Sequence, residues 1–409
     1  MAGKIHLIDV TNRDGVQASR IGLSKFQKTM LNYLLAQFGV GRSEVGFPFL
    51  SHELNYIKGN LELARAGAFD RMLLQGWCRG IPQDVEQSLP AGMEHLNLSV
   101  SVSDQMITKK YSGRRARAQV VRDMVAGVAM AREAGVKTIG VNAEDASRTD
   151  MEFLVEFTLA AKEAGAERMR YCDTLGCDTP QTIAQRMGTL TERTKMDMEI
   201  HSHNDLGLAV ANSVAGAQAV VEAGQDVYIN TTVNGIGERA GQADLVTTVL
   251  ALRFGRSLDK YEIADPVNLR MSWKLARYAS YAFKLPIPVN QPGVGANAFA
   301  HESGIHADGT LKDRYNYELY DFELVGRGDE DCVPTGRVIT TGEYGGMAGF
   351  KYVYEQMGMP MPDGRDALEV FTLVQYANAH NNLPLTDDEL RVIALYPKAV
   401  RQILTMVPA

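Results

Sequence analysis

Residues 133–174 read EAGVKTIGVNAEDASRTDMEFLVEFTLAAKEAGAERMRYCDT and hold one strand, one helix and a second strand. The apolar, β-rich runs Thr138–Ala143 and Arg168–Thr174 predict the strands, and the longer stretch between them predicts the helix. Glu-Ala-Gly stands just before each strand, at 133–135 and again at 163–165, where its glycine suits a helix C-cap. Strand-helix alternation of this kind predicts that the strands pair in parallel.

The same unit recurs along the chain. A third Glu-Ala-Gly, at 222–224, lies 59 residues after the second, whereas the first two are 30 residues apart, so the spacings correspond to two units and one unit. Strand patterns occur eight times, at Ile5–Val10, Arg42–Phe47, Arg71–Trp77, His95–Val102, Thr138–Ala143, Arg168–Thr174, Met198–Asn204 and Val227–Val233. Eight units in about 260 residues predict an α/β fold, a (β/α)8 TIM barrel. An open doubly wound sheet is the alternative, against which the missing G-x-G-x-x-G after the first strand counts.

The remainder of the chain has a different organisation. The alternation stops after about Arg256, and the stretch PIPVNQPG at 286–293 has the composition of a linker. We predict a TIM-barrel catalytic domain over residues 1–265, and a linker with mostly helical C-terminal subdomains over 266–409. The length of this second part suits a lid or an interaction subdomain.

The composition excludes several classes of protein. With 45% hydrophobic and 22% charged residues among 409, the chain is an ordinary globular protein. Its four cysteines form no C-x-x-C pair, which argues against a disulfide framework or a zinc ribbon and favours the reducing cytoplasm. A signal-peptide pattern and an apolar run of about 18 residues are both missing, and the net charge of -7 argues against nucleic acid as a partner.

Polar residues gather directly after the predicted strands. In a (β/α)8 barrel these strand ends face the active site. The candidates are Arg13, Asp14 and Gln17 after the first strand, Arg79 after the third, Glu144 after the fifth, Thr174 after the sixth, His201 and His203 in the seventh, and Asn234 after the eighth.

Two of these residues predict a metal site. Residues two apart in a strand face the same side, so His201 and His203 can both point into the barrel mouth. With Asp14 as a carboxylate ligand they would form a divalent-metal site that keeps open positions. Arg13 could stabilise negative charge on a carbonyl oxygen; a salt bridge with Asp9 or Glu144 is the alternative. Asn234 could supply a metal-facing amide or only a turn.

At these positions the chain resembles the DRE-type TIM-barrel metalloenzymes, a group that contains 2-isopropylmalate, homocitrate and Re-type citrate synthases and 3-hydroxy-3-methylglutaryl-CoA lyases. Four motifs carry the resemblance: Arg13-Asp14-Gly15, HSHNDLG at 201–207, NGIGERAG at 234–241 and HESGIHADG at 301–309. The fourth is typical of the synthases rather than the lyases. Details of the strand-end motifs look most like nitrogen-fixation-type homocitrate synthases, and Re-citrate synthases share much of that pattern.

The resemblance implies roles for the candidate residues. Asp14, His201 and His203 would bind a divalent metal such as Mn, Mg or Zn, with Asn234 close by. Arg13 and Gln17 would contact the 2-oxo acid, Thr174 would hold its carboxylate, and Arg79 is a further substrate-binding candidate. Glu144 would act with a tail histidine and tyrosine, here His306 and Tyr317. Such tails usually cross to a partner subunit, which implies a domain-swapped homodimer.

The implied reaction is a Claisen condensation of acetyl-CoA with a 2-oxo dicarboxylic acid, followed by thioester hydrolysis. The oxo acid would be 2-oxoglutarate, giving homocitrate, or oxaloacetate, giving citrate. TTGEYGG at 340–346 departs from the Gly-Lys-His-Ser-Gly of the family and leaves this choice open. The alternatives are an isopropylmalate-type condensation, an acyl-CoA lyase or aldolase, an iron oxygenase with the same ligand types, and a binding protein with a decayed site.

Overall fold

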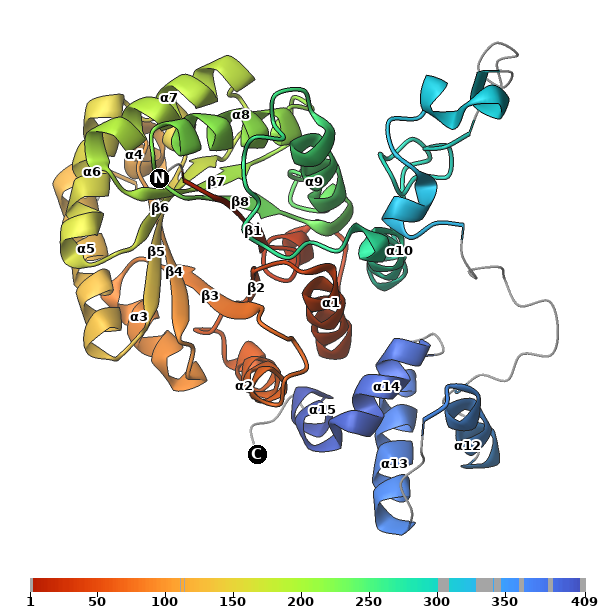
Figure 1. The fold of residues 1–409 in the computed structure, drawn as a ribbon. Coiled ribbons are helices and arrows are strands. Elements are labelled where there is room, and N and C mark those ends of the chain that lie inside the picture. The colour runs from red at the N-terminus through yellow and green to blue at the C-terminus, as the bar shows by residue number, and fades with distance from the viewer. Residues whose placement is uncertain are drawn as a thin grey trace.

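Eight parallel strands form a closed barrel in chain order, which confirms the predicted fold (Figure 1). The computed structural model describes residues 3–110, 112–113, 115–300, 309–328, 341, 347–359, 364–381 and 385–404. The barrel closes where β1 runs parallel to β8, from Ile5 opposite Val227 to Asp9 opposite Thr231. The strands are β1 (Ile5–Asp9), β2 (Arg42–Gly46), β3 (Leu73–Arg79), β4 (His95–Ser101), β5 (Thr138–Glu144), β6 (Arg168–Asp173), β7 (Asp197–Ser202) and β8 (Val227–Thr231).

All eight strands begin and end within two residues of the predicted bounds. The prediction for the seventh strand was too long, because the strand ends at Ser202 rather than Asn204. His203 instead forms an isolated antiparallel bridge with Gln242, in the loop after β8. This bridge ties the metal-ligand candidate to the neighbouring strand's loop.

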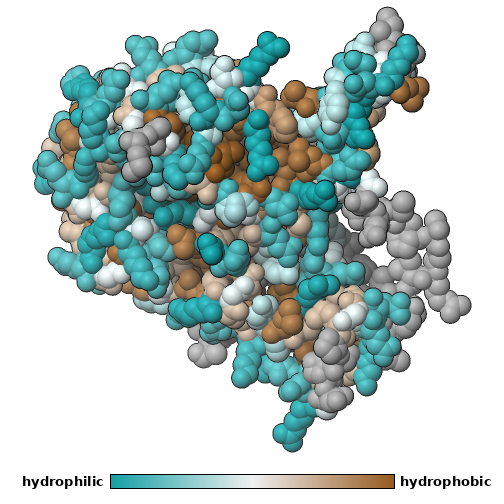
Figure 2. Space-filling view, viewed as in Figure 1, coloured by the Kyte–Doolittle hydropathy of each residue, from teal (hydrophilic) through white to brown (hydrophobic). Residues whose placement is uncertain are grey.

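Helices surround the barrel (Figure 1), and on the face shown in Figure 2 most of the surface over them is hydrophilic. Local sequence signals set their ends: Ser24 forms a capping box with Gln27 at the start of α1, and Gly165 ends α6 in the left-handed conformation. The helices of this layer are α1 (Lys25–Phe38), α2 (Ser51–Arg65), α3 (Pro82–Ser88), α4 (Asp104–Lys109), α5 (Arg117–Glu133), α6 (Met151–Ala164), α7 (Pro180–Thr194), α8 (Ala209–Glu222) and α9 (Leu245–Phe254).

The regular alternation ends after α9, as predicted. The following helices are α10 (Ser272–Phe283), α12 (Met347–Gln356), α13 (Gly364–Asn381), α14 (Asp387–Leu395) and α15 (Pro397–Leu404). In Figure 1 the last four of these form a cluster outside the barrel, and α15 packs against α2. The Tyr278 hydroxyl on α10 donates to Glu389 on α14 at 2.6 Å, which ties this cluster to the barrel side of the molecule. In the described part of the chain, every helix is too short or too polar to span a bilayer.

Charged and amide side chains fill the middle of the barrel. Glu44, Gln75, Arg168, Arg170 and Glu199 all point inward from their strands and are at most 2% exposed. A buried charge is costly unless it is paired and hydrogen-bonded. The pairing of these groups therefore determines what the interior can do.

Candidate active site

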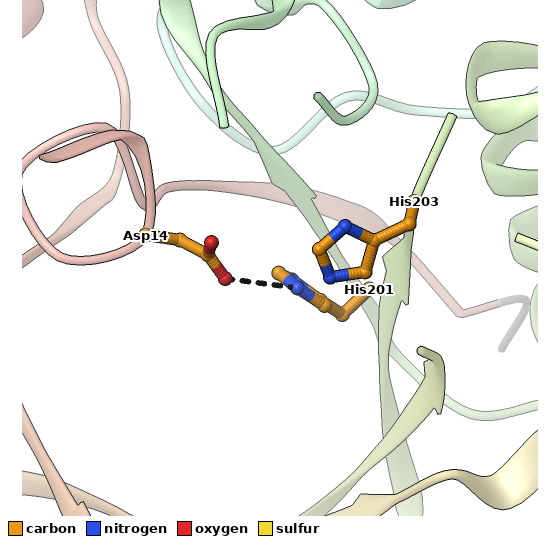
Figure 3. Close-up of side chains that lie close together, drawn as sticks. All are labelled: Asp14, His201 and His203. Carbon is orange, nitrogen blue, oxygen red and sulfur yellow. Dashed lines mark ion pairs between the residues drawn. The ribbon is translucent and has the colours of Figure 1, made fainter. Parts of the chain in front are cut away.

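The structure brings Asp14, His201 and His203 together at one mouth of the barrel (Figure 3). Their potential ligand atoms all lie within 4.8 Å of one another, and all three residues are buried. Asp14 lies on the loop that follows β1, whereas His201 lies on β7 and His203 directly follows that strand. The two rings meet edge to face, with centroids 5.1 Å apart.

The hydrogen bonds of this cluster leave two buried atoms without partners. Asp14 Oδ2 lies 2.6 Å from Arg13 Nη1 and 3.2 Å from His201 Nε2. Asp14 Oδ1 and His203 Nδ1 are buried and have no hydrogen-bond partner among the described residues. One carboxylate oxygen and one imidazole nitrogen that lack partners, beside a second imidazole, fit the donor set of a divalent cation.

The protonation states also fit a metal site. Burial alone would raise the pKa of Asp14, but Arg13 and His201 hold it well below its usual range, so the carboxylate is ionised. Burial, with a contribution from His201, lowers the pKa of His203 to about 3. His203 is therefore neutral near pH 7 and has a nitrogen lone pair available for a metal.

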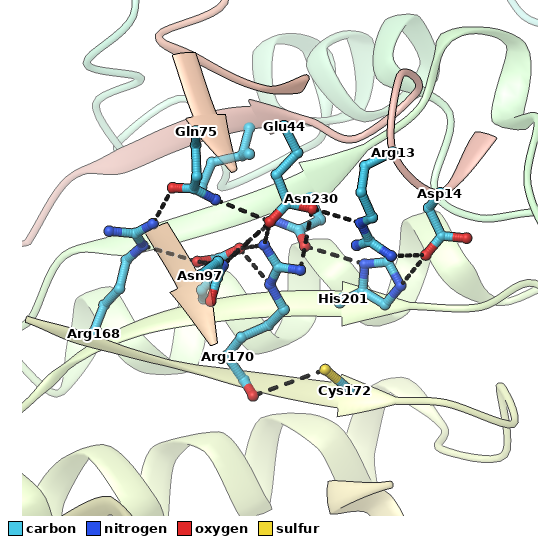
Figure 4. A network of polar contacts seen from close by, with 12 residues as sticks. Arg13, Asp14, Glu44, Gln75, Asn97, Arg168, Arg170, Cys172, His201 and Asn230 are labelled. Carbon is cyan, nitrogen blue, oxygen red and sulfur yellow. Dashed lines mark hydrogen bonds and ion pairs between the residues drawn. The ribbon is translucent and has the colours of Figure 1, made fainter. Parts of the chain in front are cut away.

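Two of the metal-ligand candidates, Asp14 and His201, belong to a closed loop of polar contacts that we call the interior ring (Figure 4). Arg13 Nε donates to Glu44 at 2.8 Å, and Arg170 contacts both Glu44 and Glu199. Glu199 accepts from Asn230 Nδ2 at 2.7 Å. The ring consists of Asp14, Arg13, Glu44, Arg170, Glu199, Asn230 and His201.

The interior ring fixes the tautomer of His201. Because Asn230 Nδ2 donates to Glu199, the atom that faces His201 Nδ1, at 3.1 Å, is Asn230 Oδ1. An amide oxygen can only accept, so Nδ1 carries the proton and Nε2 is left to face Asp14. Outer contacts of this kind orient metal-binding histidines and tune their basicity.

The ring also orients Arg13. Its Nη1 and Nε are held by Asp14 and Glu44, whereas Nη2 has no partner among the described residues. Burial would raise the pKa of Glu44, but Arg170 and Arg13 lower it to about 2, so Glu44 stays ionised and holds the guanidinium. The predicted alternative, a salt bridge from Arg13 to Asp9 or Glu144, is not formed.

A pocket of about 170 Å³ lies over this cluster. Its lining includes seven of the predicted site residues: Arg13, Asp14, Gln17, Glu144, Thr174, His201 and His203. Glu144 pairs with Lys110 at 2.7 Å, and Thr174 Oγ1 accepts from the amide of Asp145 at 2.8 Å. The structure thus gathers groups from β1, β5, β6 and β7 around one space.

The other predicted residues lie elsewhere. Arg79 is 62% exposed and pairs with Asp84 at 2.6 Å, outside the pocket lining. Asn234 is also absent from the lining. Its Nδ2 donates to the Ala276 carbonyl at 2.9 Å, and its Oδ1 is buried without a partner among the described residues. Tyr317 is 42% exposed and likewise lies outside the lining. His306 lies outside the described residues.

Sequence reasoning missed the supporting groups. Glu44, Arg170, Glu199 and Asn230 were not predicted, nor was the pocket residue Trp77. Glu238 and Arg239 were quoted within the NGIGERAG motif but were given no role. A signal existed, since Arg168, Arg170, Glu199 and His201 are charged or polar residues at alternating positions of otherwise apolar strands. Such spacing places them on one face of the strand, which in a barrel is the interior.

Comparison with known proteins is consistent with this site. A family model described as HMGL-like matches residues 4–277, about two thirds of the chain. The chain belongs to the HMGL-like family. A second model, homocitrate synthase post-HMGL domain-like, matches residues 294–381. The predicted membership of the DRE-type TIM-barrel group is thereby confirmed.

Relatives of this HMGL-like chain are synthases that match it over most of its length. The chain is 52% identical to citrate (Re)-synthase from Dehalococcoides mccartyi, over 99% of each protein. It is 33% identical to 2-isopropylmalate synthase 2 from Caldanaerobacter subterraneus, over 94% of each. Among solved structures, hydroxymethylglutaryl-CoA lyase from Pseudomonas aeruginosa superposes with a TM-score of 0.57 at 16% identity. The superposition covers 70% of this chain and 95% of the lyase, and it shows that the two proteins share a fold.

Proposed function

We propose that this protein is a divalent-metal-dependent synthase that condenses acetyl-CoA with oxaloacetate and releases citrate and CoA. The observation that carries the reaction class is the cluster of Asp14, His201 and His203 beside a fixed Arg13 in one pocket. The identity of 52% with a citrate (Re)-synthase over nearly the full length supports oxaloacetate as the oxo acid.

The reaction balances without a further cofactor. A base removes a proton from the methyl group of acetyl-CoA, and the resulting enolate carbon forms a bond to the keto carbon of oxaloacetate. The keto oxygen takes up a proton and becomes the hydroxyl of the product. Water then attacks the thioester carbonyl, the carbon–sulfur bond breaks, and CoA leaves as the thiol.

Residues of this chain account for the charged steps. A divalent ion held by Asp14, His201 and His203 would polarise the keto group as a Lewis acid. Arg13 holds positive charge beside the position where the oxyanion develops, and its Nη2 is available for that oxygen. Thr174 and Gln17 line the pocket and are proposed to bind the carboxylate end of the oxo acid.

Glu144 and the tail are proposed to supply the base. Glu144 lines the pocket and is joined to Lys110 Nζ and to the Ser101 hydroxyl, so its carboxylate is held at the rim. His306, supported by Glu144, would accept the methyl proton, with Tyr317 nearby. The enzyme is further proposed to be a cytoplasmic homodimer, with this tail segment reaching the partner's site.

The choice of oxo acid can be tested directly. CoA release is followed with a thiol reagent while oxaloacetate, 2-oxoglutarate, 2-oxoisovalerate and pyruvate are supplied one at a time with acetyl-CoA and Mn²⁺. We expect the largest kcat/KM with oxaloacetate. If none of the four acids supports CoA release, the synthase proposal is wrong.

Homocitrate synthesis is the second candidate. The match of residues 294–381 to a homocitrate synthase post-HMGL domain-like model supports it. A larger kcat/KM with 2-oxoglutarate than with oxaloacetate, and homocitrate as the product, would select this reaction.

A further inference from the structure

A second cavity, of about 460 Å³, lies at the N-terminal mouth of the barrel, at the opposite strand ends from the candidate active site. It is lined by residues from the beginnings of four strands, including His6 on β1, Arg42 on β2 and Tyr228 on β8. Asp265, from the segment between α9 and α10, closes one side. In this fold the N-terminal face usually serves stability rather than chemistry, so a charged cavity there requires an explanation.

Arg42 is a partly buried cation on the lining of this cavity. Its Nη1 donates to the Thr138 hydroxyl at 3.2 Å, and its guanidinium carbon lies 5.6 Å from the centroid of the Tyr228 ring. It forms no ion pair with a carboxylate of the described residues. A guanidinium offers five N–H donors in a planar fork, and among the described residues Arg42 donates only to Thr138.

Two acidic groups at this mouth, Asp265 and Asp226, already have hydrogen-bond partners. Asp70, the other acidic residue of the lining, is exposed to solvent. Asp265 Oδ2 accepts from the amide of Leu7 at 2.5 Å. Its carboxylate also packs directly on Gly41, where a Cβ would lie 2.2 Å from Oδ1. Asp226 accepts from the amide of Lys4 at 2.8 Å and lies 3.3 Å from His6 Nε2.

A second arginine increases the positive potential at this mouth. Arg168 lies 5.3 Å from the Tyr228 centroid, but its Nε donates to Glu199 at 2.8 Å, inside the barrel. Burial, followed by repulsion from Arg168, lowers the pKa of Arg42. Burial and then Arg42 lower the pKa of His95, which also bonds to Thr138, to about 4. Burial is the largest cause of both shifts, and the nearby arginines add to it.

We propose that the N-terminal cavity binds a small oxyanion, a carboxylate or a phosphate, through the guanidinium of Arg42. Carboxylates and phosphates match the fork of arginine with two parallel hydrogen bonds. A bound anion would supply the counter-charge that Arg42 lacks. His6 and Tyr228, whose rings stack with centroids 4.5 Å apart, form a flat wall of the cavity. The site is separate from the proposed catalytic pocket, and anion binding there can be measured without any catalytic reaction.

Calorimetric titration of the full-length protein, in the presence of a metal chelator, tests the proposal with two probes, sodium malonate and sodium phosphate. We expect the wild type to bind at least one of them. Tighter binding of malonate assigns the site to carboxylates, and tighter binding of phosphate assigns it to phosphoryl groups.

Matched variants at the two barrel mouths separate this site from the catalytic pocket. Arg42→Gln is expected to weaken anion binding at least tenfold. Arg13→Gln removes the guanidinium of the catalytic pocket and is expected to leave the anion affinity unchanged. Arg42→Lys keeps the charge without the fork and should weaken binding less than Arg42→Gln; it also keeps the test valid if Arg42→Gln does not fold. Lys137→Gln, at the same end of the barrel but paired with Glu94 outside the cavity, is the control and should have no effect.

Two results would overturn the proposal. The first is wild-type binding weaker than about 10 mM for both probes. The second is binding that is lost in Arg13→Gln and retained in Arg42→Gln and Arg42→Lys, which would place the anion in the catalytic pocket.

Discussion

The Asp14 carboxylate has one oxygen that accepts from Arg13 and faces His201 Nε2, and one buried oxygen with no partner among the described residues. A buried acceptor in this state costs free energy, on the order of 1–3 kcal/mol, unless a ligand satisfies it. At the same time its neighbours lower the pKa of the group, so the negative charge persists. This combination is what a metal ligand requires: an ionised oxygen that folding leaves available.

Asp14→Asn therefore tests the metal site. The amide keeps the shape of the side chain but removes the charge, so we expect affinity for Mn²⁺ to fall at least about 100-fold, beyond the range for supporting residues. CoA release should fall in parallel. Calorimetric titration with Mn²⁺ measures the affinity. Glu152→Gln, which alters an exposed carboxylate paired with Arg193, is the control, and unchanged Mn²⁺ binding by Asp14→Asn would contradict the assignment.

The depressed pKa of His203 predicts a pH dependence of stability in the metal-free protein. The folded pKa is about 3 and the ordinary value is 6.5, so between these pH values the unfolded chain binds more protons. Stability from the neutral imidazole is therefore fully present above pH 6.5 and is lost as the pH falls towards 3. Between pH 6.5 and 4 the loss should be about 3 kcal/mol in the free energy of unfolding.

Urea unfolding of the wild type and His203→Gln at several pH values measures this effect. Contributions from other groups, such as His95 and Glu44, are common to both proteins and cancel in the difference. The advantage of the wild type over His203→Gln should shrink as the pH falls from 6.5 to 4. A difference that stays constant over this range would show that His203 is not held in its neutral form.

At the scale of elements, strands were predictable because their apolar runs alternate with helical stretches at a regular spacing. Thr138–Ala143 and Arg168–Thr174, for example, match β5 and β6 to within one residue at each end. The barrel then placed Asp14, His201 and His203 at one mouth, because strand ends converge there. The interior ring was not predictable in this way, because its contacts join side chains from five segments, such as Glu44 on β2 and Arg170 on β6. Which of these side chains touch depends on how they pack inside the barrel, and sequence spacing does not show this.

Asn230 shows how β8 supports the ligand on β7. Asn230→Leu removes the acceptor of the His201 Nδ1 proton and the donor to Glu199. We expect the affinity for Mn²⁺ to fall by about 10–100-fold, as for other outer-shell contacts of metal-binding histidines. Ser43→Ala, which changes a buried residue of β2 that bonds to Asn32 on α1 and lies outside the ring, is the control for general loss of packing. Equal losses of Mn²⁺ affinity in the two variants, at equal stability, would exclude the positioning role.

At the scale of the whole molecule, the catalytic pocket and the tail raise a question of assembly. The pocket lining contains seven of the predicted barrel residues, whereas Tyr317 lies in the segment 309–328 and outside that lining. This segment exposes Leu311 (89%), Tyr315 (62%) and Leu319 (70%). Neighbouring large apolar side chains that face solvent mark surfaces that bind another protein. A second copy of the chain, exchanging this segment with its partner, would cover them and complete both sites.

Complementation between two inactive variants tests this arrangement. His203→Ala disables the barrel and His306→Ala disables the tail. If the tail crosses between subunits, a heterodimer has one site in which an intact barrel meets an intact tail, and its other site carries both defects. Half of the dimers in an equal co-expressed mixture are heterodimers, so we expect about one quarter of the wild-type rate of CoA release.

If each tail serves its own barrel, every site in the mixture carries a defect. The two variants have equal masses, so each carries a different affinity tag, and purification through both tags in turn shows that heterodimers are present. No recovery in such a sample would assign the tail to its own subunit. A monomeric mass for the wild type would exclude the exchange altogether.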